Sequence, residues 1–180
     1  MYRLFIAINF ESYIIEHIQN VCFGVKNARW VPKNHMHLTL RFIGECDSHE
    51  YNIIQSCLSN ITYQPFPITL EGVGYFPPRK NPRILWIGVK PNNKLKMLRT
   101  IIDKKLEQIG IPKENKKFHP HITIARLRNS VKPTSIIPFL TNNSLFKSDS
   151  INIHNFHLYS SILRREGVFH QIEQTYNLKY

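Results

Sequence analysis

The chain has 180 residues, which suits one domain with an ordinary core, and 42% of them are hydrophobic, which excludes an intrinsically disordered protein. Lys and Arg number 24 against 12 Asp and Glu. The resulting formal charge of +12 favours a polyanionic partner, either nucleic acid or an anionic membrane surface.

The N-terminal segment lacks the features of a signal peptide or a membrane anchor. A short apolar run follows Arg3, but Glu11 and Glu16 interrupt it well before the ~20 residues that a membrane span needs. We therefore expect a cytoplasmic protein with no membrane partner. The three cysteines lack the CxxC spacing of zinc sites and are expected to be reduced structural thiols: Cys22, Cys46 and Cys57.

The first half of the chain predicts two strand–helix units. Apolar runs and alternating patterns indicate strands, and apolar residues at three- and four-residue intervals indicate helices. A Ser at the start of the second helix is the expected N-cap. These elements are a strand over Arg3–Phe10, a helix from Glu11 to about Val25, a strand over His37–Ile43 and a helix from Ser48 to about Asn60.

The second half predicts further strands around a third, clearer helix. A proline-rich loop, Gly74–Pro82, is expected between two of the strands, and the last two strands are expected to flank Arg164–Gly167. No linker divides the chain, so residues 1–180 are expected to form a single domain. The predicted elements are strands over Phe66–Val73 and Arg83–Lys90, a helix from Asn93 to about Ile109, a strand from His121, a short helix over Ser135–Leu140, and strands over Ile151–Ser160 and Val168–Tyr176.

A pattern of His, apolar, Thr, apolar occurs twice, in the segments His37–Leu40 and His121–Ile124. Because side chains alternate along a strand, each histidine shares a face with its own threonine, while the apolar residues point into a core. The repetition suggests a duplicated, two-lobed sheet in which the two histidines face each other across a cleft.

Two facing imidazoles and two hydroxyls suit in-line displacement at a phosphodiester. One imidazole would take a proton from the attacking water and the other would give one to the departing oxygen, since the pKa of histidine permits both roles. The threonine hydroxyls would donate hydrogen bonds to the non-bridging phosphate oxygens. This chemistry requires no metal and no other cofactor.

Two other classes of protein stay open. The HxH segments His35–His37 and His119–His121 have the spacing of a zinc or copper site, although such a site gives no reason for the two threonines. A metal protein would lose activity to a chelator. The other alternative is a basic RNA-binding module with incidental histidines, whose binding would survive loss of either one.

The sequence resembles the two-histidine phosphoesterases, and within them the bacterial and archaeal 2′-5′ RNA ligase-like branch of RNA 2′,3′-cyclic phosphodiesterases. HxTx by itself is a weak pattern, but two copies in these flanks are highly specific. The similarity runs nearly end to end and is carried by the segments Arg3–Ile8, Arg29–Pro32, His37–Glu45, Gly72–Pro77, Leu85–Val89, Phe118–Arg126 and Leu158–Ser161.

The resemblance implies a bilobal α+β fold with pseudo-twofold symmetry, antiparallel-rich sheets, helices on the outer faces and a central active-site cleft. It implies hydrolysis of RNA 2′,3′-cyclic ends to 2′-phosphomonoesters, with His37 as proton donor and His121 as proton acceptor. Thr39 and Thr123 would bind the phosphate. The implied partner is RNA or an oligonucleotide with a cyclic phosphate end. Ligation to a 2′-5′ bond by the same residues is the alternative activity, and a monomer is the default expectation.

Two arginines are candidates for a further phosphate contact. The family's phosphate-binding arginine matches Arg126, but strict alternation from His121 places Arg126 on the opposite face, so it reaches the site only if the strand bends or ends there. Arg41 is in phase with His37 and is the second candidate. An aromatic platform for the neighbouring base is also expected, from among Tyr75, Phe76, Phe118 and Tyr159.

Overall fold

The computed structural model describes residues 1–128, 131–164 and 167–179, and an eight-stranded antiparallel sheet forms its centre. The strands of this sheet are β1 (Tyr2–Ile8), β2 (Ala28–Trp30), β3 (Leu38–Cys46), β5 (Leu70–Phe76), β6 (Ile84–Val89), β7 (His121–Leu127), β9 (Asn155–Arg164) and β10 (Gly167–Asn177). Their order is β10-β9-β1-β3-β7-β6-β5, and β2 pairs with the free part of β7. A separate ribbon pairs β4 (Phe66–Ile68) with β8 (Ile151–Ile153).

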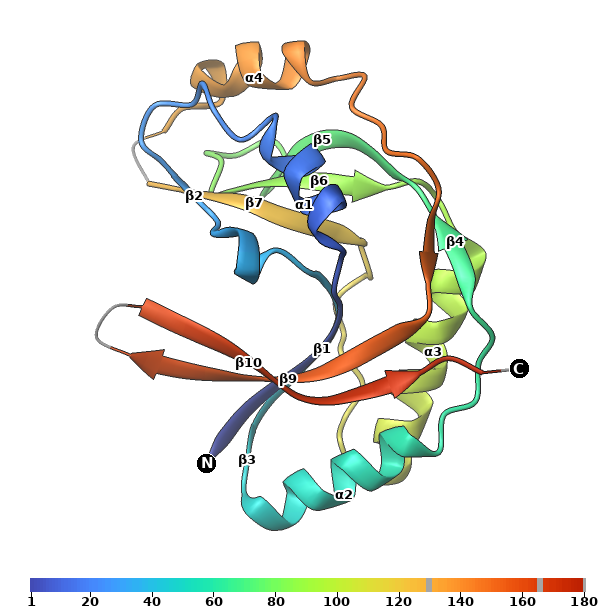
Figure 1. Ribbon diagram of the computed structural model, residues 1–180. Helices are drawn as coiled ribbons and strands as arrows, with labels where there is room; N and C mark the ends of the chain where they lie inside the picture. The colour runs from blue at the N-terminus through green and yellow to red at the C-terminus, as the bar shows by residue number, and fades with distance from the viewer. Residues whose placement is uncertain (129–130, 165–166, 180) are drawn as a thin grey trace.

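The large sheet consists of two halves that meet at a single residue pair. Strands β10, β9, β1 and β3 make one half, and β7, β6, β5 and β2 make the other; β3 and β7 pair only through Leu38 and Ile122. In Figure 1 the half with β2, β6 and β7 lies above the half with β9 and β10. The predicted bilobal, antiparallel-rich α+β fold is therefore confirmed.

The helices cover the outer faces of the two lobes. They are α1 (Ser12–Gln19), α2 (Ser48–Ser59), α3 (Asn93–Gln108) and α4 (Ile137–Asn142), with short 3₁₀ turns over Lys33–His35 and Pro133–Ile136. Figure 1 places α1 and α4 on the upper lobe, and α2 and α3 on the lower lobe, where α3 contacts β3 and α2 contacts β10. Among the described residues, no helix is long and apolar enough to cross a membrane.

The helix ends differ from the sequence-based expectations at two places. The N-cap of α2 is Asp47 rather than Ser48, because the Asp47 carboxylate accepts from the backbone N–H of Glu50 while the Glu50 carboxylate accepts from that of Asp47. Helix α1 ends at Gln19, well before Val25, since the following backbone forms turns instead of helical bonds.

Strand limits also differ, because cross-strand partners decide them. The two expected strands over Phe66–Val73 and Ile151–Ser160 are each broken, since β4 and β8 pair with each other outside the large sheet. Tyr75 and Phe76 pair with β6 and are not part of a loop. Strand β2 was not predicted. Residues 165 and 166 of the expected final turn lie outside the described residues.

Candidate active site

The two HxT motifs cross each other where the lobes meet. Strands β3 and β7 are antiparallel and pair at Leu38 and Ile122, whose side chains are fully buried. An antiparallel register through this pair sets His37 beside Thr123, and Thr39 beside His121, on the sheet face opposite to the two apolar side chains. The structure therefore brings together all four motif residues from positions far apart in the sequence.

Aromatic side chains of the first lobe enclose the ring of His37. The ring centroid of Phe5 on β1 lies 4.9 Å from that of His37, and the centroid of Tyr159 on β9 lies 5.8 Å away. The ring of His170 on β10 meets His37 edge-on at 5.5 Å. The His37 side chain also forms a hydrogen bond with the backbone of His35, which further restrains the ring. These contacts hold the imidazole in one orientation.

The ring of His121 has a similar setting in the second lobe. Phe76 and Trp86 lie 5.0 Å and 6.3 Å from it, centroid to centroid. Its Nδ1 donates a hydrogen bond of 2.6 Å to the backbone carbonyl of His119. Because a carbonyl oxygen only accepts, the proton sits on Nδ1, and Nε2 is the nitrogen left to exchange a proton with a substrate.

Burial lowers the pKa of both motif histidines. The pKa of His37 falls from 6.5 to about 4, chiefly through burial and next through the charge on His170. Burial also lowers the pKa of His121, although its hydrogen bond to His119 acts in the opposite direction. Positive charge on His121 further lowers the pKa of His37. An anion bound between the two rings would oppose these shifts and favour an imidazolium.

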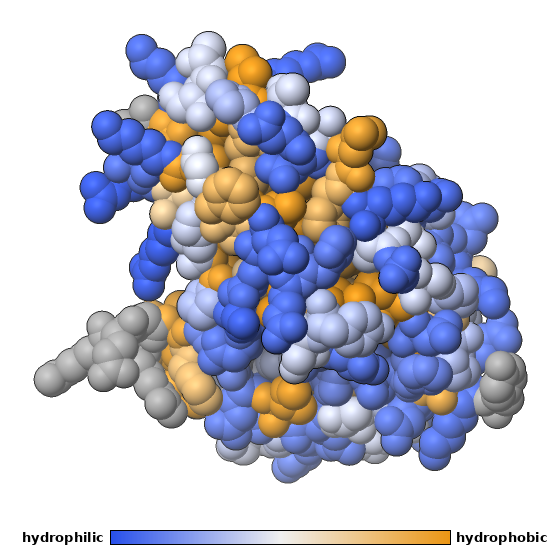
Figure 2. All heavy atoms as spheres, turned by 45° about the horizontal axis from the view of Figure 1, so that its top comes forward, coloured by the Kyte–Doolittle hydropathy of each residue, from blue (hydrophilic) through white to orange (hydrophobic). Residues whose placement is uncertain are grey.

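A cavity of about 580 Å³ opens on the face of the sheet that carries the motifs. His37, Thr39 and Thr123 line it, whereas His121 is not among the lining residues and lies next to them. Figure 2 shows the surface hollowed between the lobe that carries α4 and the hairpin of β9 and β10. The other lining residues are Arg3, Leu4, Phe5, Arg29, Trp30, Val31, Pro32, His35, Phe42, Gly44, Arg126, Ser161, Leu163, Val168 and His170.

A β-bulge in β7 brings Arg126 to this cavity. Against β6, the register passes from Ala125 to Thr123 and skips Ile124. Ile124 and Ala125 are consequently both fully buried, and the next residue, Arg126, returns to the face of Thr123. Arg126 is exposed and lines the cavity. We expected Arg126 to reach the site only if its strand bends or ends there, and the bulge in β7 is such a bend.

A matching bulge in β3 removes Arg41 from the site. Against β1, the register passes from Arg41 to Thr39 and skips Leu40, so that Leu40 and Arg41 are both buried. The prediction that Arg41 shares the face of His37 was wrong, because alternation does not continue across a bulge. Phe42 takes the place in β3 that Arg126 has in β7, and it lines the cavity with 59% of its surface exposed.

Arg41 belongs instead to a buried ionic cluster, which we call the arginine–carboxylate cluster: Arg41, Arg99, Asp103 and Glu114. The Nε of Arg41 lies 3.2 Å from Oδ1 of Asp103, and its Nη1 lies 3.4 Å from Oε2 of Glu114. Arg99 contacts the same two carboxylates, and Arg41 also donates to the carbonyl of Pro112. The cluster ties β3 to α3 and to the segment that leads into β7.

The aromatic residues at the cavity are not the expected ones. Tyr75, Phe76, Phe118 and Tyr159 do not line it, since Phe76 and Tyr159 pack on the motif histidines and Phe118 lies under Arg99. Phe5, Trp30 and Phe42 line it instead. Phe42 is the second residue after the first motif, but only the strand pairing reveals which face it occupies.

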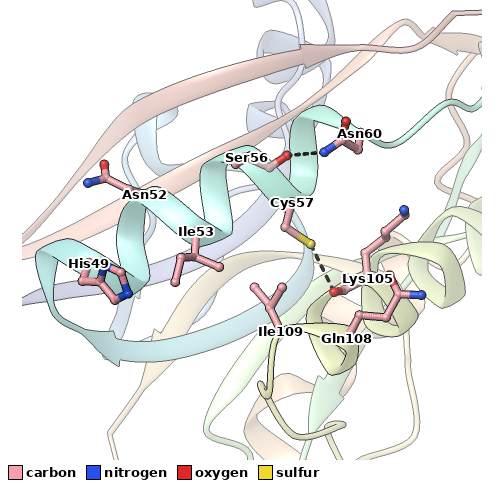
Figure 3. Close-up of a pocket in the computed structure, with 9 residues that line it drawn as sticks. All are labelled: His49, Asn52, Ile53, Ser56, Cys57, Asn60, Lys105, Gln108 and Ile109. Atoms are coloured by element: carbon pink, nitrogen blue, oxygen red, sulfur yellow. Dashed lines mark hydrogen bonds between the residues drawn. The ribbon is translucent and has the colours of Figure 1, made fainter.

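The described residues contain no group of three or more His, Cys, Asp or Glu side chains that could hold a metal ion. The cysteines are free. Figure 3 shows a second hollow, of about 500 Å³, between α2 and α3, where Cys57 Sγ donates to the carbonyl of Lys105 at 3.1 Å. Burial raises the pKa of the Cys57 thiol, so the thiol is a structural group. Neither motif histidine lines this hollow.

Comparisons with known proteins agree on one family. The model of the LigT-like phosphoesterase family matches the chain twice, over residues 14–86 and 87–170, so that each match contains one HxT motif. A protein of Archaeoglobus fulgidus named RNA 2′,3′-cyclic phosphodiesterase is 32% identical and covers 92% of this chain and 94% of its own length. A protein of Thermotoga maritima with the same name is also 32% identical, over 94% of this chain and 92% of its own.

Solved structures share the fold. LigT of E. coli superposes with a TM-score of 0.81 at 24% identity, covering 99% of this chain and 98% of its own. The protein TT0787 of Thermus thermophilus gives a TM-score of 0.81 at 24% identity, with 98% and 97% coverage. The duplicated match, the two crossing motifs and the shared architecture agree, and the chain belongs to the LigT-like phosphoesterase family of enzymes.

Proposed function

We propose that this chain hydrolyses the 2′,3′-cyclic phosphate at an RNA end to a 2′-phosphomonoester, without a metal ion. The observation that carries the proposal is the crossing of the two HxT motifs at the pair of Leu38 and Ile122, because this register brings the two motifs side by side. Relatives over most of the chain are named for this activity. LigT of E. coli, which shares the fold, has been crystallised with the nucleoside monophosphate 3′-AMP.

In the proposed reaction, His121 takes a proton from a water molecule whose oxygen attacks the phosphorus. The bond from phosphorus to the 3′ oxygen breaks, and His37 gives its proton to that oxygen, which leaves a 2′-phosphate. Thr39 and Thr123 donate hydrogen bonds to the non-bridging oxygens. The tautomer of His121 supports its role as acceptor, because Nε2 carries the lone pair. A phosphate bound beside His37 would raise its lowered pKa and so supply the imidazolium that the donor role needs.

Two residues at the cavity complete the proposed substrate site. Arg126 would neutralise the phosphate from the second lobe, where the bulge in β7 aims it. Phe42, exposed on the opposite strand, would stack on the base of the terminal nucleotide. The free cysteines agree with a reducing compartment such as the cytoplasm. We also expect residues 1–180 to act as one two-lobed domain and a monomer, which light scattering coupled to size-exclusion chromatography tests.

The test is product analysis with an oligonucleotide that ends in a 2′,3′-cyclic phosphate, incubated in EDTA with the wild type, His37→Ala or His121→Ala. We expect a 2′-phosphate from the wild type and a loss of about 10²–10⁴ in kcat for each variant. Activity that EDTA abolishes, or full activity in either variant, would contradict the proposal. A ligated 2′-5′ product in place of the 2′-phosphate would mean that an RNA 5′-hydroxyl, and not water, attacks the phosphorus of the cyclic phosphate.

The pH profiles of the same two variants test the separate roles. A base must be deprotonated and an acid protonated, so wild-type kcat/KM is expected to be bell-shaped in pH. The residual activity of His121→Ala should lose the acidic limb of the bell, and that of His37→Ala the alkaline limb. The opposite pattern would exchange the two roles.

A further inference from the structure

Three arginines from three strands line the cavity, and the proposed reaction uses only one of them. Arg126 comes from β7, Arg29 from β2 and Arg3 from β1, so that both lobes contribute. Arg29 and Arg126 are cross-strand partners in the pairing of β2 with β7, which places their side chains on the same face. Arg3 belongs to the strand that carries Phe5, across the cavity from that pair.

Acidic side chains are scarce around these arginines: Glu45 is the cross-strand partner of Arg3, but it does not line the cavity. Among the described residues, the ones that line the cavity include no Asp or Glu, and the other titratable side chains there are His35, His37 and His170. Within residues 1–128, 131–164 and 167–179, neither Arg3 nor Arg29 forms an ion pair, whereas Arg41 and Arg99 do so in the arginine–carboxylate cluster.

This arrangement costs folding energy, which points to a ligand. Like charges placed directly opposite each other on neighbouring strands are destabilising, as Arg29 and Arg126 are here. A single cyclic phosphate carries one negative charge, and its two non-bridging oxygens already have donors in Thr39, Thr123 and Arg126. Arg3 and Arg29 therefore exceed what one phosphate needs, and they fit a second anionic group in the same cavity.

The remaining walls fit a nucleic-acid strand between two such anions. Phe42, Leu163 and Val168 present exposed apolar surface at the cavity, with 59%, 84% and 46% of their areas accessible. Sites for single-stranded nucleic acid combine cationic side chains for the backbone with apolar or aromatic surfaces for the bases. Figure 2 shows this combination around the hollow, with hydrophilic side chains on the upper lobe and hydrophobic ones at the base of the β9–β10 hairpin.

We propose that Arg3 and Arg29 form a second phosphate subsite, which binds the phosphodiester on the 5′ side of the terminal nucleotide. This inference rests on the proposed function and refines its substrate: the site is built for an oligonucleotide end rather than for a nucleoside 2′,3′-cyclic monophosphate. Arg126 serves the scissile phosphate, and the subsite serves the next phosphate along the chain.

The experiment compares two substrates that share the reacting nucleotide: adenosine 2′,3′-cyclic monophosphate and the dinucleotide ApA with a 2′,3′-cyclic phosphate end. The quantity compared is kcat/KM for the dinucleotide divided by kcat/KM for the mononucleotide. We expect this ratio to fall about tenfold in Arg3→Gln and in Arg29→Gln, because each variant loses charge-assisted hydrogen bonds to a phosphate. The salt dependence of dinucleotide KM should also weaken by about 0.7 in logarithmic slope for each contact removed. Arg126→Gln should lower kcat/KM for both substrates. Lys96→Gln, on the exposed face of α3, is the matched charge control and should change neither.

The outcomes separate the subsite from the proposed function. A ratio that stays within about twofold of the wild-type value in both variants would overturn the subsite, whether the substrates are affected equally or not at all. Turnover of the mononucleotide by the variants shows at the same time that they are folded. A wild type that hydrolyses neither substrate would refute the proposed function itself.

Discussion

Asp103 stabilises two buried guanidiniums, and removing its charge should destabilise the fold strongly. Arg41, Arg99 and Asp103 are 5%, 5% and 8% exposed, and both arginines contact the Asp103 carboxylate. Removing one partner of a buried ion pair costs about 3–5 kcal/mol. Glu114 continues to neutralise part of the charge. For Asp103→Asn we therefore expect a loss of about 3 kcal/mol, near the lower end of that range.

The assay is urea denaturation followed by circular dichroism, together with a thermal melt. For a chain of this length, a loss of about 3 kcal/mol corresponds to a fall in Tm of about 6–12 °C. Glu107→Gln removes an exposed carboxylate from the same helix and should change stability by about 0.5 kcal/mol or less. Adding Arg41→Met to Asp103→Asn should recover part of the lost stability, because Glu114 then neutralises the single remaining guanidinium, that of Arg99. A free energy of unfolding for Asp103→Asn that matches the Glu107→Gln value would refute this reasoning.

Three further predictions concern the site and its support. The pKa of His37 lies at about 4 in the folded chain against 6.5 in the unfolded one, so its contribution to stability is complete above pH 6.5 and is lost as the pH falls toward 4. Urea denaturation at pH 7.5 and 4.5 should therefore show a smaller acid loss for His37→Gln than for the wild type, and equal losses would contradict the assignment. Gly74→Ala places a Cβ against the six-membered ring of Trp86, closer than packed atoms approach, so calorimetry should show a destabilisation of about 1–3 kcal/mol; an unchanged Tm would mean that Trp86 moves freely. Phe42→Ala should raise KM for the cyclic-ended oligonucleotide about tenfold with little change in kcat, because base stacking is lost, and an unchanged KM in steady-state kinetics would exclude Phe42 as the platform.

Local sequence patterns predicted most of the regular elements, because their causes are local. The apolar spacing and end signals of α3 depend on neighbouring residues, and the observed helix, Asn93–Gln108, ends within one residue of the expected position. The alternation at each motif similarly indicated Leu38 and Ile122 as buried and the His and Thr residues as their opposite face. Strand β2 and the ribbon of β4 and β8 depend instead on distant partners, and the sequence did not predict them.

The sequence by itself determined the duplicated fold and which residues we propose as catalytic, since two HxT motifs in matching flanks specify two imidazoles and two hydroxyls. The tertiary structure decided which cationic side chains and which aromatic ring lie at the cavity beside the two motifs. Bulges at Leu40 and Ile124 turn Arg41 into the core and bring Phe42 and Arg126 to the cavity. A bulge arises from the register between two strands, and so it leaves no periodic trace in either strand alone.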